Sequence, residues 1–284
     1  METQKKHGHA IASNDKKMDT SSTNQPIATF VPNHLTLAET VRLPAFPHAL
    51  YSYEGSTYVG MNNCCIARVN NSQLAESFIK CTNPVQSVAM YKDRVYALLA
   101  SRSIKNDDQV CVYDMLGQLQ ATWNHPVSSF NCNALTIVSD QLILPDLFHQ
   151  KLTVYSLLGK VIKNIPCSAI GNSRLAMCAA GSDSVIISDS SSNTVFKMSI
   201  NSGEIIWKCE EIIEPQCITC DERGQVLVVS EEKLLRVLDA GKGNVIRKVT
   251  GLVDGFKAGL YVYENQLLAI SHERKELLTY QWNN

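Results

Sequence analysis

The chain has 284 residues, of which 45% are hydrophobic and 19% charged, and its 26 basic and 27 acidic residues leave a net charge of −1. A charge so close to zero argues against a protein whose main task is to coat nucleic acid or an anionic membrane. The longest unbroken apolar runs, 95–100 and 175–180, have six residues each. A membrane-spanning helix needs about 20, so we expect no membrane span.

The first 25 residues are rich in Lys, Ser, Thr, Asn and Asp and contain almost no large apolar side chain. Such a segment cannot bury enough surface to offset its ordering entropy, so we predict a disordered N-terminal tail over 1–25. Four Lys and three acidic residues give it a charge of +1, which leaves −2 for the remainder. It has no apolar stretch typical of a secretory signal. Because the ten cysteines also follow no disulfide-framework spacing, we expect reduced thiols and a cytoplasmic location.

From residue 40 onward, short apolar stretches alternate with Gly, Asn, Asp and Ser, which is typical of many short β-strands. A turn residue followed by a β-rich triplet recurs six times. The turn residues are Gly55, Asp93, Asp140, Asp183, Gly224 and Asn265, at intervals of 38, 47, 43, 41 and 41 residues. A second series, of strand, tight turn and strand, has turn glycines 42, 44 and 40 residues apart: Gly117, Gly159, Gly203 and Gly243. In the first unit, Asn71-Ser72 takes the place of the glycine.

Two series with one period of about 42 residues predict six four-stranded units. A unit of this length and strand number is a propeller blade, so we predict an all-β, six-bladed β-propeller over 35–284. The expected blades cover 45–84, 85–127, 128–171, 172–213, 214–255 and 256–284. The last supplies only three strands, at about 258–263, 266–271 and 275–282. We expect 35–43 to add the missing outer strand and close the ring, because pairing of the N- and C-terminal strands removes two open sheet edges.

Two local features need an interpretation of their own. The segment 231–238 contains good helix formers and, taken alone, favours an amphipathic helix; the repeat places it where its counterparts are strands, which we prefer. Cys217 and Cys220 form the only close C-x-x-C pair. We expect both on one strand with their thiols on opposite faces, whereas a zinc site needs four ligands.

Several repeat positions carry a family signature. The matching residues are Pro145, Asp146, Ser188, Asp189, Asn193, Val195, Pro215, Asp221 and Gly224. They resemble the NHL repeat, and by overall look the chain is similar to the six-bladed NHL propeller at the C-terminus of tripartite-motif proteins, over about 35–284. The resemblance implies a recognition propeller that binds protein or RNA. The RING and B-box modules of that family are not seen here, so we do not expect ligase activity in this chain.

Residues that follow the second strand of each expected blade should lie in loops on one common face. The candidate binding residues on that face are Asn62, Arg102, Asp146, His149, Asp189, Glu231, His272 and Arg274. Their charges are mixed, which disfavours a cation site, because a hard cation takes six or more oxygen ligands. No Gly-x-Ser-x-Gly elbow and no phosphate-binding Gly-x-x-x-x-Gly-Lys-Ser/Thr loop occurs. We therefore expect no catalytic residue, metal or cofactor.

These features favour a non-enzymatic protein-interaction module. At a finer level, we expect an adaptor role in a ubiquitin-related or innate-immune pathway. Two alternatives stay open. One is an RNA-binding NHL-type propeller, although the basic residues are dispersed, with Arg247-Lys248 and Arg274-Lys275 the only basic pairs outside the predicted tail. The other is a metal-dependent hydrolase of the six-bladed type. The sequence indicates neither the partner nor the oligomeric state.

Overall fold

The computed structural model describes residues 34–70, 73–101, 107–126, 134–171, 174–221, 223–252, 256–263 and 265–282. The predicted tail over 1–25, the Asn71-Ser72 turn and Arg102 lie outside these residues. The chain divides into two compact units, 1–30 and 31–284, and all described residues belong to the second.

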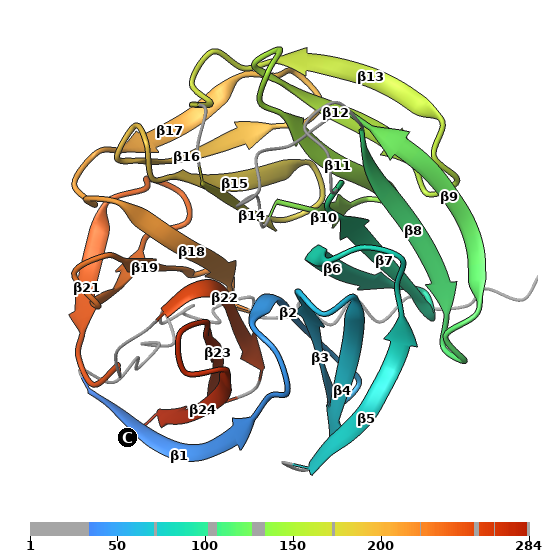
Figure 1. Ribbon diagram of the computed structural model, residues 1–284. Coiled ribbons are helices and arrows are strands. Elements are labelled where there is room, and N and C mark those ends of the chain that lie inside the picture. The colour runs from blue at the N-terminus through green and yellow to red at the C-terminus, as the bar shows by residue number, and fades with distance from the viewer. Residues whose placement is uncertain are drawn as a thin grey trace, which may run out of the picture. The chain divides into compact units, whose positions relative to one another are not determined.

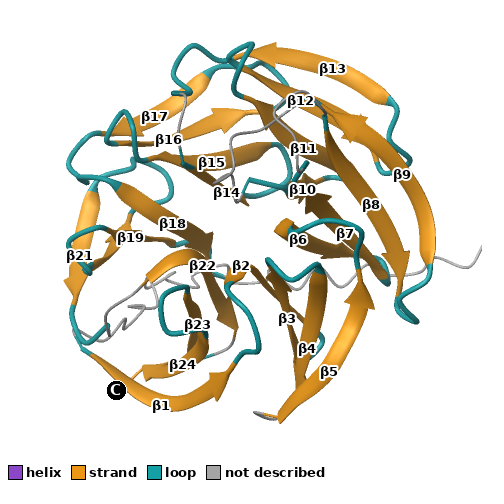
Figure 2. Cartoon of the chain, viewed as in Figure 1, coloured by secondary structure: helices purple, strands orange, loops and turns teal. Residues whose placement is uncertain are grey.

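The described residues form six four-stranded antiparallel sheets and no helix (Figure 2). Blade 1 comprises β2 (Pro47–Tyr53), β3 (Ser56–Met61), β4 (Cys65–Asn70) and β5 (Gln73–Lys80). Blade 2 comprises β6 (Val85–Tyr91), β7 (Arg94–Leu99), β8 (Asp108–Asp114) and β9 (Leu119–His125). Blade 3 comprises β10 (Thr136–Val138), β11 (Gln141–Asp146), β12 (Lys151–Ser156) and β13 (Val161–Pro166). Blade 4 comprises β14 (Leu175–Ala179), β15 (Ser184–Asp189), β16 (Thr194–Ser199) and β17 (Ile205–Cys209). Blade 5 comprises β18 (Pro215–Cys220), β19 (Val226–Ser230), β20 (Leu235–Leu238) and β21 (Val245–Val249). Blade 6 comprises β22 (Phe256–Tyr263), β23 (Gln266–Ser271), β24 (Glu276–Trp282) and, as its outer strand, β1 (Leu35–Arg42).

Within the second unit the six sheets are arranged in a ring, which confirms the predicted six-bladed β-propeller (Figure 1). The first strand of each blade lies nearest the centre and the fourth lies at the rim. Every triplet of the repeat series falls on the second strand of a blade, as expected.

The ring closes through the two ends of the unit. β1 pairs antiparallel with β24, from Leu35 opposite Trp282 to Arg42 opposite Glu276, with an irregularity between Leu37 and Glu39. Leu35 is buried in the apolar cluster between blades 5 and 6. The predicted closure by the N- and C-terminal strands is therefore confirmed.

The segment 231–238 is not helical. Its first residues form a turn, and β20 begins at Leu235. Leu235 and Val237 pack between blades 5 and 6, whereas Leu238 packs between blades 4 and 5. Burial on both faces of a sheet outweighs the weak helix propensity of the segment, since tertiary packing routinely overrides such preferences.

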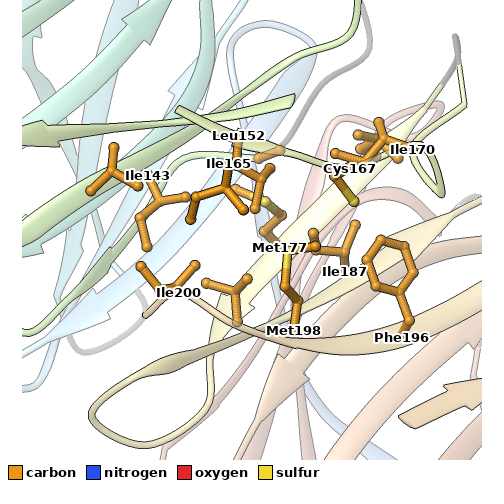
Figure 3. Packing of buried hydrophobic residues seen from close by; sticks show 14 of the residues in the cluster. Ile143, Leu152, Ile165, Cys167, Ile170, Met177, Ile187, Phe196, Met198 and Ile200 are labelled. Atoms are coloured by element: carbon orange, nitrogen blue, oxygen red, sulfur yellow. The ribbon is translucent and has the colours of Figure 1, made fainter. Parts of the chain in front are cut away.

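The core consists of apolar layers between neighbouring blades rather than of one central cluster. Between blades 3 and 4, Ile143 and Leu152 face Met177 and Phe196 (Figure 3). On β15, Val185 and Ile187 belong to this layer, while Ile186 faces blade 5. A strand that buries both faces must be apolar at every position, which explains the unbroken triplets in the sequence.

The ring has two faces that differ in the loops they carry. One face carries the connections between blades and the turns between second and third strands, and we call it the loop face. These turns lie at 62–64, 147–150, 190–193, 231–234 and 272–275. The turn face carries the turns between third and fourth strands, at 115–118, 157–160, 200–204 and 239–244. Antiparallel pairing places these two sets at opposite ends of each sheet.

Candidate functional site

The candidate binding residues that the structure describes all lie at the loop face, but at two depths. Asn62, His149, Glu231 and Arg274 are exposed, and His272 is half-buried. Asp146 and Asp189 are fully buried beneath the surface, each as the last residue of a second strand. The two carboxylates are thus in place to hold loops rather than to touch a partner directly.

Asp146 organises the loop of blade 3. Its carboxylate accepts hydrogen bonds from the backbone N–H of His149 at 3.1 Å and from His149 Nδ1 at 2.8 Å, and it forms an ion pair with Lys151 at 3.4 Å. Burial raises the pKa of Asp146, but these bonds and the two neighbouring groups outweigh it and hold the pKa below its usual value. The carboxylate therefore stays ionised and fixes the loop at neutral pH.

This loop presents an aromatic side chain to solvent. Phe148 is 85% exposed, and its ring meets the imidazole of His149 edge-on at a centroid distance of 5.1 Å. His149 is in turn bonded to Asp146. An exposed apolar ring thus lies on a loop that hydrogen bonds to a buried carboxylate hold in place.

Asp189 plays the equivalent part in blade 4. It accepts from the backbone N–H of Gly171 at 2.6 Å, from that of Ser191 at 2.9 Å and from the Ser191 hydroxyl at 2.6 Å. Gly171 lies in the connection from blade 3, so the carboxylate joins that connection to the turn at 190–193. Sequence reasoning placed Asp189 on the loop face but did not foresee its burial, because nothing in the local sequence points to Gly171.

A second cluster lies where the ring closes. Phe46 stacks on His272 at 5.0 Å, Lys275 Nζ lies 4.3 Å from the Phe46 ring centre, and His48 lies 5.0 Å from His272. Burial, and then the neighbouring His272, lower the pKa of His48. Residues more than 220 positions apart meet here only because β1 joins blade 6.

A chain of polar side chains connects blade 4 to the loop of blade 5. Arg174 donates to Gln216 Oε1 at 3.1 Å, and Gln216 Nε2 donates to Glu231 Oε2 at 3.2 Å. The two hydrogen bonds place a cation and an anion at opposite ends of one chain of side chains. It also adds to the mixed charge that the sequence predicted for this surface.

Beneath the loop face lies a set of buried polar groups, of which the sequence singled out only Asp146 and Asp189, and as exposed binding residues. We call it the buried polar layer, and its members are Asp108, His125, Asp146, Asp189 and Arg236. His125, which has no solvent exposure, bonds through Nε2 to the Pro145 carbonyl at 3.0 Å and through Nδ1 to the Tyr155 hydroxyl at 2.9 Å. It therefore joins blades 2 and 3. Burial lowers the pKa of His125, so it is neutral at pH 7.

The innermost strands surround a central cavity of about 200 Å³. Its wall is mainly apolar, and none of its described lining residues is an Asp, Glu, Lys, Arg or His. Hydroxyl groups come from Tyr51, Ser87, Thr136, Thr219 and Tyr261, and thiols from Cys178, Cys217 and Cys220. The described segments contain no group of three or more His, Cys, Asp or Glu residues placed to hold a metal ion.

The cysteines bear out one further expectation. Cys217 packs between blades 5 and 6, whereas Cys220 packs between blades 4 and 5, so the two thiols lie on opposite faces of β18. None of the nine cysteines in the described segments forms a disulfide.

The geometry defines a six-bladed β-propeller, and comparison with solved structures agrees. The fold is similar to the WD40 β-propeller domain of Doa1 (TM-score 0.64, 10% identity, 90% of this chain and 98% of that one). It is also similar to virginiamycin B lyase from Staphylococcus aureus (0.62, 11%, 87% and 99%) and to the computationally designed protein Ika8 (0.56, 12%, 89% and 100%). At such identities the likeness concerns the fold alone. No family model and no curated protein matches the chain. Within the described segments there is no helix that could cross a membrane.

Proposed function

We propose that this propeller is a non-enzymatic protein-interaction module and that the loop face is its contact surface. The observation that carries the proposal is Phe148, which is 85% exposed although its loop is held by the buried Asp146. A large aromatic ring on a rigid support gains much apolar burial on binding and loses little conformational entropy. Such residues supply most of the affinity at protein interfaces.

Other exposed side chains of the loop face suit a protein partner. Ile213, in the connection from blade 4 to blade 5, is the other strongly exposed apolar side chain at this face among the described residues. Glu231 and Arg274 are exposed at the same face and carry opposite charges. Apolar anchors among charges of both signs are typical of a protein interface, whereas RNA binding depends on clustered Lys and Arg.

At a finer level, we propose that the chain acts as an NHL-like recognition propeller with an adaptor role in a ubiquitin-related or innate-immune pathway. The support is the NHL-like spacing of residues such as Pro215, Asp221 and Gly224. The nine cysteines without a disulfide are consistent with the reducing cytoplasm that we expect for the protein.

The experiment compares two single substitutions in the same blade. Phe148→Ala removes the exposed ring from the loop face, and Leu158→Ala removes a side chain of similar exposure, 75%, from the turn face. Wild type and both variants are immobilised as full chains, bound proteins are captured from cell lysate, and the dissociation constant is measured for each purified partner. Truncation of an interface anchor costs about 2 kcal/mol, so Phe148→Ala should weaken binding at least about tenfold.

Leu158→Ala should leave the dissociation constant unchanged. The reverse pattern would assign the interface to the turn face, and equal affinities for all three proteins would reject both surfaces. A labelled RNA pool applied in parallel to the immobilised protein at low salt tests the RNA alternative. Retention of RNA that falls steeply with added salt would favour RNA binding over the present proposal.

A further inference from the structure

Two cysteines meet at the wall of the central cavity. Cys178 on β14 and Cys220 on β18 belong to the innermost strands of blades 4 and 5 and lie 42 residues apart, one repeat length. Their sulfur atoms are 3.4 Å apart, within hydrogen-bonding contact. Both residues border the cavity of about 200 Å³ and are half-buried. The fold thus brings two thiols of different blades together at an internal space.

A third thiol supplies an internal reference. Cys217 lies three residues before Cys220 on the same strand, but it is 2% exposed and packs toward blade 6. Burial raises the pKa of Cys217 to about 12, so it stays protonated and unreactive. On the same strand, Cys220 therefore contacts a second thiol, whereas Cys217 packs among apolar side chains on the opposite face.

We propose that Cys178 and Cys220 form an oxidation site at which hydrogen peroxide, admitted by the central cavity, creates a reversible disulfide between blades 4 and 5. A disulfide has a sulfur–sulfur distance of about 2.05 Å, so the two side chains need to close by about 1.4 Å. Peroxide is about the size of two water molecules, so a cavity of about 200 Å³ has room for it beside the two sulfurs.

The two sulfurs react in sequence. Contact with Cys220 and burial raise the pKa of Cys178, which disfavours its thiolate. In the proposed order Cys220 therefore attacks first and Cys178 second. The thiolate of Cys220 bonds to one oxygen of peroxide, the O–O bond breaks, and hydroxide leaves and takes up a proton, which produces water and a sulfenic acid at Cys220.

Cys178 completes the reaction. Its sulfur bonds to the sulfur of the sulfenic acid, the S–O bond breaks, and the hydroxyl group leaves as water with the proton of Cys178. In sum, two thiols and one peroxide become one disulfide and two waters; the sulfurs lose two electrons and the peroxide gains them. A thiol reductant reverses the step.

The disulfide would staple two blades at their innermost strands. It closes a loop of one repeat, and cross-linking restricts the unfolded chain more than the folded one. Oxidation should therefore raise the melting temperature by several degrees, since each kcal/mol corresponds to roughly 2–4 °C in a domain of this size.

The test uses the purified full chain. It is exposed to graded hydrogen peroxide, its remaining thiols are alkylated, and it is digested with trypsin without reduction. The disulfide should join peptide 175–197, which contains Cys178, to peptide 209–223, which contains Cys209, Cys217 and Cys220. Cys217→Ser is the matched control and should retain the link, whereas Cys220→Ser should abolish it.

Two further readouts make the outcome decisive. In Cys178→Ser the attacking sulfur has no partner, so dimedone should trap a sulfenic acid at Cys220. The peroxide-dependent rise in melting temperature should occur in wild type and Cys217→Ser, be reversed by dithiothreitol, and be absent from Cys178→Ser. A link through Cys209 or Cys217, or over-oxidised Cys220 without any link to Cys178, would overturn the proposal.

Discussion

The two faces of the propeller differ in the burial of the groups that hold their loops. At the loop face, the loops are held by the buried polar layer. Its carboxylates Asp146 and Asp189 accept hydrogen bonds from loop N–H groups. At the turn face, glycines of the tight turns pack directly under a side chain of the preceding blade. Both arrangements leave an apolar side chain facing solvent, Phe148 at the loop face and Leu158 at the turn face.

The turn-face contact recurs from blade to blade. A Cβ on Gly159 would lie 2.5 Å from Trp123, and one on Gly243 would lie 2.3 Å from Trp207. Gly203 has the same relation to Ile165, at 3.0 Å. All three glycines have positive φ, which other residues rarely adopt. The series of turn glycines in the sequence therefore marks contacts between neighbouring blades, not only tight turns.

The largest expected effect is the loss of a buried carboxylate. Asp189→Ala removes a fully buried carboxylate that accepts hydrogen bonds from the N–H groups of Gly171 and Ser191. Gly171 is half-buried and Ser191 is exposed. Each hydrogen bond to a charged group contributes about 2 kcal/mol, so we expect a loss of about 4 kcal/mol of unfolding free energy. Urea unfolding measures it.

Asp114→Ala is the matched control at the turn face. Asp114 also accepts from two backbone N–H groups, those of Leu116 and Gln118, both at 2.9 Å, but its turn is exposed. Water can replace the carboxylate there, and we expect a loss of about 1 kcal/mol. Equal losses for the two variants would show that burial does not distinguish the faces.

The next effect concerns the glycine contacts. Gly243→Ala places a methyl group against the Trp207 ring and retains a positive φ of 74°; we expect about 3 kcal/mol of destabilisation, about 1 from the backbone and about 2 from overpacking. Gly224→Ala is the control, because its φ is 80° but no atom lies within 4 Å of the added Cβ. It should cost about 1 kcal/mol in thermal unfolding. A cost for Gly224→Ala as large as that for Gly243→Ala would remove Trp207 from the explanation.

The smallest effect is a pH dependence of the buried polar layer. Burial lowers the pKa of His125, against smaller opposing effects of the Pro145 carbonyl and of Asp146. The unfolded chain, in which His has a pKa near 6.5, therefore binds more protons as the pH falls. Stability from His125 should be fully present above about pH 6.5 and decline below it, by at most about 1.4 kcal/mol per pH unit.

His125→Gln isolates this contribution, because other groups, His48 among them, titrate in the same range. The difference in urea midpoint between wild type and His125→Gln should shrink as the pH falls from 7 to 5. A constant difference would mean that His125 keeps the same protonation in the folded and unfolded chains.

Much of the architecture could be predicted because each of its causes acts over a few residues and repeats. The triplet Val185-Ile186-Ile187 is apolar throughout because its strand buries both faces, and the equivalent triplets follow the same rule. The glycine series is visible because sterics admit one residue type at each of those turns. Burial of Asp189 and the partners of His125 could not be predicted, because each has a different partner in a different blade.

The sequence by itself therefore determined the blade number, the strand order and the closing strand, since a period of about 42 residues and a missing fourth strand leave one arrangement that pairs all edges. Only the tertiary structure decided which side chains meet. Phe46 contacts His272, and Cys178 contacts Cys220, because the ring brings residues that are distant in the sequence together. No local pattern in the sequence encodes these contacts. Contacts between blades depend on the curvature of the ring and on side-chain volume, and a one-dimensional repeat contains neither.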